Sequence, residues 1–213
     1  MFPYDADALF AFLAQYNLAL WPAQILALLM ALGAILLVLR PRSGSGHIVG
    51  AILAASWLSS GAVYYLVYLS AIDFVSPLFG LLLIVQGLLM AWDGAIRGRL
   101  SFSFHRDWSG WAALALVLAA LMYEPVIALL GAQDWLAVRV VGLAPAPTMV
   151  FTVGLLLLAE RFALYLLVIP ILWSISALAL AWFLGIPADL VLPLAGIAAG
   201  VLIIWRRTRG VRV

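Results

Sequence analysis

Cysteine and lysine are both missing from this sequence of 213 residues. Without cysteine, the chain has no disulfides, no thiol catalysis and no thiolate metal sites. Without lysine, Schiff-base chemistry is excluded, and with it retinal attachment and aldolase-type catalysis. Only two histidines are present, His47 and His105, and both flank apolar runs in basic loops. A haem held by two histidines deep inside a helical bundle is therefore excluded.

Charge is also scarce, because only 9% of the residues are charged while 68% are apolar. A soluble domain of this size carries roughly 25% charged residues to cover its surface. Most of the outer surface therefore faces lipid. No polar linker divides the chain, so we predict an all-α membrane protein in which residues 1–213 form a single transmembrane bundle.

Seven apolar runs predict seven transmembrane helices. They cover residues 17–39, 48–70, 77–96, 110–130, 147–159, 162–185 and 190–205. The fifth run is shorter than the ~20 residues that cross a hydrocarbon core. We expect it to lie inside the bundle, where protein or water can meet its ends. Ahead of the first run, Asp5 or Asp7 can cap a short interfacial helix.

The arginines predict the orientation of the bundle. Arg40, Arg97 and Arg161 each lie in a loop between two runs, and in a seven-span chain these three loops are on the same side of the membrane. Four further arginines follow the last run, on that side as well. Only Arg139 falls on the opposite side. Because cytoplasmic loops carry the excess of basic residues, we predict an outer N-terminus and a cytoplasmic C-terminus.

An internal repeat is indicated by a shift of 116 residues, which places the second and third runs on the sixth and seventh. Trp57 then aligns with Trp173, and Asp73 aligns with Asp189. We predict two parallel three-helix repeats, 17–96 and 147–205, joined by a linker helix at 110–130. The alternative is that each aspartate merely caps a helix, four residues ahead of a proline, and that the alignment is chance.

This three-plus-one-plus-three plan with an outer N-terminus resembles the SWEET and PQ-loop transporters and the vitamin transporters related to them. In the SWEET carriers, the second helix of each triplet offers a tryptophan to the central pocket. Trp57 and Trp173 occupy the matching positions. The resemblance implies a transporter in which these two indoles face each other across a central cavity.

Local motifs point to a second resemblance. They are Trp21-Pro22-x-Gln24, Arg97-Gly98-Arg99-Leu100-x-Phe102 and Pro147-Thr148 followed by Phe151-Thr152-x-Gly154. In these motifs the chain looks like an uncharacterised family of bacterial inner-membrane proteins, a domain of unknown function. This resemblance implies the bacterial cytoplasmic membrane and carries no activity.

Polar and deep aromatic side chains are the candidates for a binding site, because such groups are costly inside a bilayer. We predict a ligand-binding cavity lined by Asn17, Trp21, Gln24, Trp57, Tyr64, Gln86, Glu124, Thr148, Thr152 and Trp173. Each has a simpler interpretation. Trp21 suits an interfacial belt, and the amide and hydroxyl groups suit bonds between helices. Glu124 either pairs with Arg139 as a structural clamp or is protonated.

Two functions remain open. The first is a carrier or binder of a small neutral or cationic organic molecule, with a pocket near the midplane between the repeats. The alternative is a non-transporting subunit or scaffold, in a homo-oligomer or a larger membrane complex, whose glycines suit tight helix contacts. An enzyme ranks last, because we find no catalytic constellation, metal ligands or cofactor motif. The lipid bilayer is the expected partner, and nucleic acid is not.

The absence of native cysteine allows a direct test of topology. Single cysteines at positions 3 and 210 should react with a membrane-impermeant thiol reagent from opposite sides of the membrane, position 3 from outside. Labelling of intact cells against inverted membrane vesicles measures this. Reaction of both positions from the same side would disprove the seven-span arrangement.

Overall fold

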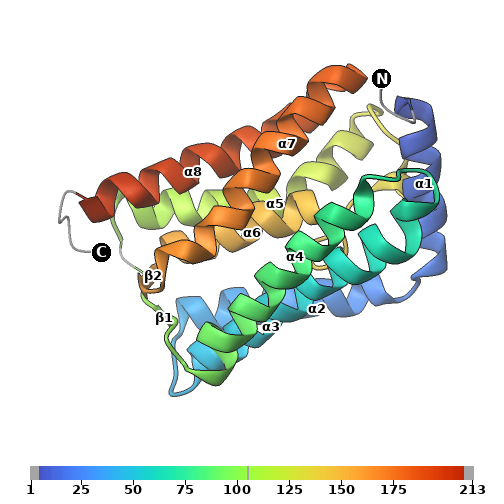
Figure 1. The fold of residues 1–213 in the computed structure, drawn as a ribbon. Coiled ribbons are helices and arrows are strands. Elements are labelled where there is room, and N and C mark those ends of the chain that lie inside the picture. The colour runs from blue at the N-terminus through green and yellow to red at the C-terminus, as the bar shows by residue number, and fades with distance from the viewer. Residues whose placement is uncertain (1–4, 105, 209–213) are drawn as a thin grey trace.

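The structure is a computed structural model that describes residues 5–104 and 106–208, so His105 lies outside the described residues. Eight α-helices dominate this part of the chain (Figure 1). They are α1 (Ala6–Ala19), α2 (Ala23–Leu39), α3 (Ser45–Ser59), α4 (Ser76–Met90), α5 (Trp108–Leu129), α6 (Pro145–Leu157), α7 (Val168–Leu184) and α8 (Val191–Thr208). The predicted all-α class is confirmed.

Short helical segments of other pitch extend these helices. The π-helix η1 (Ser60–Tyr68) and the 3-10 turn η2 (Leu69–Ala71) continue α3, and the π-helix η3 (Ala91–Ile96) continues α4. The 3-10 turns η5 (Leu164–Leu167) and η6 (Pro187–Leu190) lead into α7 and α8, and η4 (Trp135–Ala137) lies in the loop before α6. The strands β1 (Ser101–Phe102) and β2 (Ala159–Arg161) pair in antiparallel fashion.

Five helical stretches are long and apolar enough to cross a membrane. They are Ser45–Ala71, Ser76–Ile96, Trp108–Leu129, Leu164–Leu184 and Pro187–Thr208. A sixth is added if the bent pair of α1 and α2 counts as one span. The chain is therefore a multi-pass membrane protein, and five of the predicted runs match these stretches to within three residues at either end.

The first predicted run is corrected by the structure. Residues 17–39 do not form one straight helix, because α1 and α2 meet at an angle of 87°. Proline 22 stands at this bend, where its missing N–H removes a helical hydrogen bond. The short helix expected ahead of the first run is present and is longer than expected, while its place at the membrane interface stays a prediction. It runs from its cap at Asp5, which accepts a hydrogen bond from Ala8 N at 2.9 Å, to Ala19.

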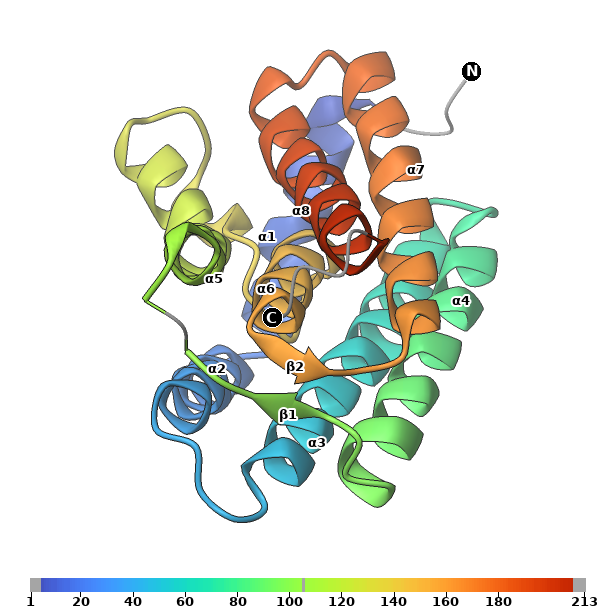
Figure 2. The same ribbon diagram turned by 90° about the vertical axis from the view of Figure 1, so that its left-hand side faces the viewer.

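The short helix α6 occupies the centre of the bundle, and all thirteen of its residues are buried. Figure 2 shows α6 enclosed by the other helices, and its contacts are with α3, α5, α7 and α8. Its two threonines satisfy their hydroxyls locally. Thr148 Oγ1 donates to Ala144 O at 2.6 Å, and Thr152 Oγ1 donates to Thr148 O at 2.7 Å. The expectation that this short run lies inside the bundle is confirmed.

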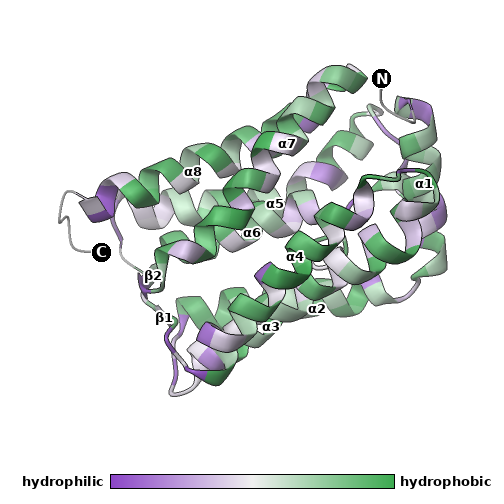
Figure 3. Ribbon diagram, viewed as in Figure 1, coloured by the Kyte–Doolittle hydropathy of each residue, from purple (hydrophilic) through white to green (hydrophobic). Residues whose placement is uncertain are grey.

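The two ends of the bundle differ in charge. We call one the arginine end, made of residues 40–44, 97–104, 106–107, 158–163 and 206–208, and the other the acidic end, made of α1 and residues 71–76, 130–144 and 185–190. Among the described arginines, only Arg139 lies at the acidic end. Figure 3 shows hydrophilic residues gathering towards these two ends. The predicted clustering of arginines is thus present in the fold.

Tryptophans mark both ends as well. Trp92, Trp108, Trp111 and Trp205 are exposed near the arginine end, and Trp21, Trp135 and Trp182 are exposed near the acidic end. The remaining two, Trp57 and Trp173, are buried between them. Exposed tryptophans in two bands are typical of the interfaces on either side of a bilayer. This pattern supports the belt interpretation for Trp21.

Glycines allow the helices of the α3–α4 hairpin to approach closely. A Cβ atom on Gly61 would lie 2.7 Å from Gly80 O, and one on Gly50 would lie 2.6 Å from the backbone of Gly94.

The second hairpin, α7–α8, packs against α6. The three-helix repeats remain a prediction, since α2 packs on α3 whereas α6 packs mainly on α5 and α8.

Replacing Gly61 tests this close approach. In Gly61→Ala the new methyl would press on Gly80 O and on the backbone of Ile84, so we expect the variant to lose about 1–3 kcal/mol of stability. Gly33→Ala is the matched control, because nothing lies within 4 Å of its added Cβ. Thermal unfolding in detergent micelles compares them. Equal midpoints would contradict the packing.

Candidate functional site

A cavity of about 470 Å³ lies between the α3–α4 hairpin and the α7–α8 hairpin. Figure 1 shows the two hairpins diverging towards the end of the bundle that α1 crosses. Both hairpins contribute to the walls, through residues such as Tyr65 and Leu180, and Leu9 of α1 reaches the cavity from the acidic end. Pro145 and Ala146, the first residues of α6, also line it. The cavity therefore occupies the half of the bundle nearer the acidic end.

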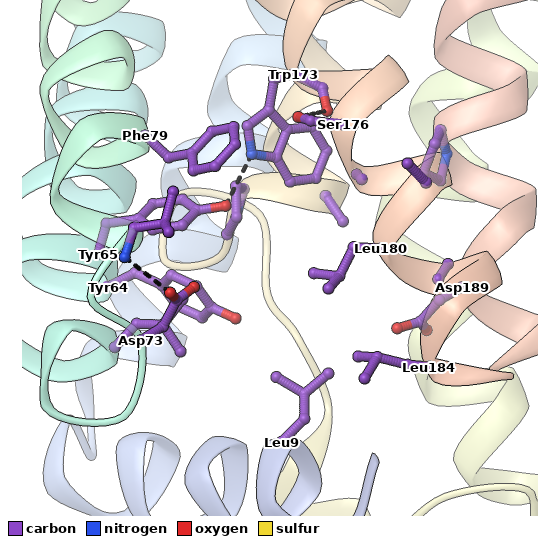
Figure 4. A pocket seen from close by; sticks show the side chains of 18 of the residues that line it. Leu9, Tyr64, Tyr65, Asp73, Phe79, Trp173, Ser176, Leu180, Leu184 and Asp189 are labelled. Atoms are coloured by element: carbon purple, nitrogen blue, oxygen red, sulfur yellow. Dashed lines mark hydrogen bonds between the residues drawn. The ribbon is translucent and has the colours of Figure 1, made fainter. Parts of the chain in front are cut away.

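One wall of the cavity is aromatic. The indole of Trp173 donates from Nε1 to the hydroxyl of Tyr65 at 2.9 Å, which fixes both rings (Figure 4). Tyr65 in turn stacks on Phe79 with ring centroids 6.0 Å apart, and it meets Tyr64 edge to face at 5.2 Å. The wider π-helical turn of η1 carries the adjacent residues Tyr64 and Tyr65 to the same cavity. Such π-helical segments are frequent at functional sites.

Two carboxylates face the cavity from opposite hairpins. Asp73 lies in the loop between η2 and α4, and Asp189 lies in η6 ahead of α8. Figure 4 places them on opposite sides of the cavity. Asp73 Oδ1 accepts a hydrogen bond from Val75 N at 2.9 Å, which fixes the start of α4. These are the two aspartates that the 116-residue shift aligns.

Arg139 joins Asp189 and Glu124 in a buried ion cluster. Its guanidinium makes a bidentate contact with Asp189, and its Nη2 lies 2.9 Å from Glu124 Oε1. Gln133 Nε2 donates to Glu124 Oε2 at 3.0 Å. Burial alone would lower the pKa of Arg139, but the charges of Glu124 and Asp189 raise that pKa above its ordinary value. The predicted Glu124–Arg139 clamp is therefore present, with Asp189 as an additional member.

Comparison with known proteins places this chain in a family. The model of a family of unknown function, DUF6064, matches residues 6–212. The chain belongs to this family. No curated protein matches it, and no solved structure matches it either. The resemblance to an uncharacterised family is thus confirmed at the level of family, and the activity must be argued from the cavity itself.

In this DUF6064 chain, two of the ten predicted site residues line the cavity, namely Tyr64 and Trp173. Trp57 does not. It is fully buried in α3, and its Nε1 donates to Thr152 Oγ1 at 2.9 Å. The structure therefore corrects the expectation that Trp57 and Trp173 face each other across one cavity. Trp57 instead satisfies its N–H on α6, which a buried indole must do.

The remaining predicted residues serve contacts between elements. Thr148 accepts a hydrogen bond from Gly142 N at 2.8 Å, and Gln86 Nε2 donates to Leu166 O at 2.8 Å. Asn17 Nδ2 donates to Leu136 O and Val138 O, and Gln24 Nε2 donates to Asn17 O. Trp21 is 67% exposed. These bonds secure α1, α2 and α4 to their neighbours, away from the cavity.

Sequence reasoning missed four cavity residues that matter, Tyr65, Phe79, Asp73 and Asp189. The 116-residue shift aligns the two aspartates with each other. Because aligned positions lie at the same end of the bundle, this alignment could have predicted that both aspartates lie near one site. For the aromatic pair the sequence offers no comparable signal. Within the described residues, no three His, Asp or Glu side chains come together to ligate a metal.

Removing the arginine of the ion cluster should destabilise the fold strongly. Arg139→Gln leaves the buried Glu124 and the partly exposed Asp189 without a guanidinium, at a cost of about 3–5 kcal/mol. Glu124→Gln keeps the Arg139–Asp189 pair and should cost clearly less. Arg40→Gln, at an exposed position, is the control and should change little. Thermal unfolding in detergent ranks the three variants, and an Arg139→Gln midpoint equal to that of the control would refute the cluster's role.

Proposed function

We propose that this protein binds a small neutral or cationic organic molecule in the cavity between the two hairpins and carries it across the membrane. The observation that carries this proposal is the cavity itself, whose volume of about 470 Å³ falls within the range of ~300–1000 Å³ typical of ligand pockets. Its walls come mainly from the α3–α4 hairpin on one side and the α7–α8 hairpin on the other. A ligand there would contact both hairpins at once.

Alternating access would follow if the two hairpins rock against each other around the ligand. Towards the acidic end the hairpins diverge, whereas nearer the arginine end α4 meets η5 and α7. The fully buried Gln86 bonds α4 to η5 at that contact, through the carbonyl of Leu166. We assign Gln86 to a latch that must open when the cavity turns to the other side.

We further propose seven crossings with the N-terminus outside and the C-terminus in the bacterial cytoplasm. The supporting observation is that every described arginine except Arg139 lies at the arginine end, which is the cytoplasmic end by the positive-inside rule. On this orientation, α2 and the buried α6 join the five long spans to give seven. The cavity then opens towards the outside.

The scaffold alternative rested on glycines that could seat a partner's helices. Those glycines are Gly61, Gly80, Gly87, Gly196 and Gly200, and in each a Cβ atom would come within 2.9 Å of a neighbouring atom of the same chain. They serve packing inside the bundle. These glycines therefore give no specific support to a scaffold, and we favour the binding function because of the cavity.

Cysteine accessibility tests whether the cavity receives small molecules. Ala177→Cys places a thiol on the cavity wall, in a chain that has no other cysteine. In purified protein we expect N-ethylmaleimide to modify this thiol readily. Ala113→Cys, at a fully buried position away from the cavity, should stay unreactive, and Ala132→Cys in an exposed loop sets the upper rate. If Ala177→Cys is as inert as Ala113→Cys, the cavity is closed and the proposal fails.

A further inference from the structure

The charges around the cavity point to the class of ligand. Within the described residues, the acidic end and the helix termini next to it carry six carboxylates and one guanidinium. They are Asp5, Asp7, Asp73, Glu124, Asp134, Asp189 and Arg139. A cleft with an excess of one sign of charge and low-dielectric walls concentrates the opposite ion. The acidic end therefore favours cations over anions. Of its charged residues, Asp73, Asp189 and Arg139 line the cavity itself.

The single arginine at this end is not available to an anionic ligand. Both terminal nitrogens of Arg139 bind Asp189, and Nη2 also contacts Glu124. An anion would have to displace a carboxylate from this buried cluster, which would leave that carboxylate without its counter-charge. The cluster is thus closed to anions and keeps an excess of negative charge.

Asp73 is in a different situation from Asp189. It is partly exposed and it lines the cavity. Among the described residues its carboxylate accepts one hydrogen bond, from the backbone N–H of Val75. No guanidinium pairs with Asp73 in the part of the chain that the structure describes. An ionised carboxylate can accept about four hydrogen bonds. Asp73 therefore retains both charge and acceptor capacity towards the cavity.

The aromatic wall suits the same kind of ligand. Trp173, Tyr65 and Phe79 present ring faces or edges beside the cavity (Figure 4). Ring faces are the negative side of an aromatic quadrupole, so they attract an ammonium or guanidinium group and also accept apolar surface. Much of the remaining lining is apolar as well, and it includes alanines and leucines of α7. An apolar body that carries one positive charge matches the aromatic and apolar parts of this wall and Asp73, while Arg139, which also lines the cavity, is already paired with Asp189 and Glu124.

Resting on the proposed function, we infer that the ligand is an organic cation, with an ammonium-type charge on an apolar body. Asp73 is its counter-ion. The apolar body lies against the aromatic wall of Trp173, Tyr65 and Phe79, and the positive charge points towards the acidic end. Asp189 stays paired with Arg139 and contributes to the negative field.

Two thiol reagents of similar size but opposite charge test this assignment in the Ala177→Cys protein. They are 2-(trimethylammonio)ethyl and 2-sulfonatoethyl methanethiosulfonate, used on purified protein in uncharged detergent. The rate with the cationic reagent is divided by the rate with the anionic one, and this ratio is compared with that of Ala132→Cys. We expect the ratio to be about tenfold or more higher at position 177.

Second-site variants assign the preference to Asp73. Adding Asp73→Asn should reduce the ratio at position 177 most of the way to that at position 132, while Asp73→Glu should retain it. Asparagine can still accept the hydrogen bond from Val75 N, so the start of α4 is preserved. An equal ratio at the two positions, or an unchanged ratio in Asp73→Asn, would overturn the cation assignment.

N-ethylmaleimide separates the two possible failures. If this neutral reagent modifies Ala177→Cys but charge has no effect on the rates, the cavity accepts small molecules and only the ligand class is wrong. If N-ethylmaleimide fails as well, the cavity is closed and the proposed function falls with the inference.

Discussion

The bundle depends on a helix that is shorter than the hydrocarbon core of a membrane. With thirteen residues, α6 is about 20 Å long, whereas a hydrocarbon core is about 30 Å thick. Unpaired backbone groups at its ends cannot face lipid. The chain meets this constraint by burying every residue of α6 and by placing protein at both ends. The loop of residues 138–144 covers one end, and the paired strands β1 and β2 adjoin the other.

The cavity follows from the same shortfall in length. Where α6 is present, α7 and α8 pack against it. Beyond Pro145 there is no central helix left to fill the space, and the hairpins diverge around the gap (Figure 1). Arg139 stands just ahead of α6, and it ties the loop to α5 through Glu124 and to η6 through Asp189. The loop is thereby held at one side of the space, which leaves the remainder as a cavity.

Sequence reasoning located the long helices well because their apolar runs are determined locally by burial in lipid. It missed the bend at Pro22 because proline is tolerated inside transmembrane helices, so the residue alone did not predict a break. In the structure Asn17, in the last turn of α1, bonds to the carbonyls of Leu136 and Val138, over a hundred residues away. It also misplaced Trp57, because depth along a helix does not indicate which neighbour the indole meets. Tyr64 and Trp173 were correctly predicted to line a cavity. The sequence could not show which way their side chains point, because that depends on tertiary packing.

The charge of Asp73 is more than the fold requires. Its structural task is to accept the N–H of Val75 at the start of α4, and a neutral asparagine performs that task about as well. A carboxylate with no cationic partner carries a desolvation cost that an amide avoids. Asp189 offsets this cost through Arg139, whereas within the described residues Asp73 has a backbone N–H alone. Among the described residues, the charge therefore serves no structural contact that an amide could not make, and we assign it to the proposed cationic ligand.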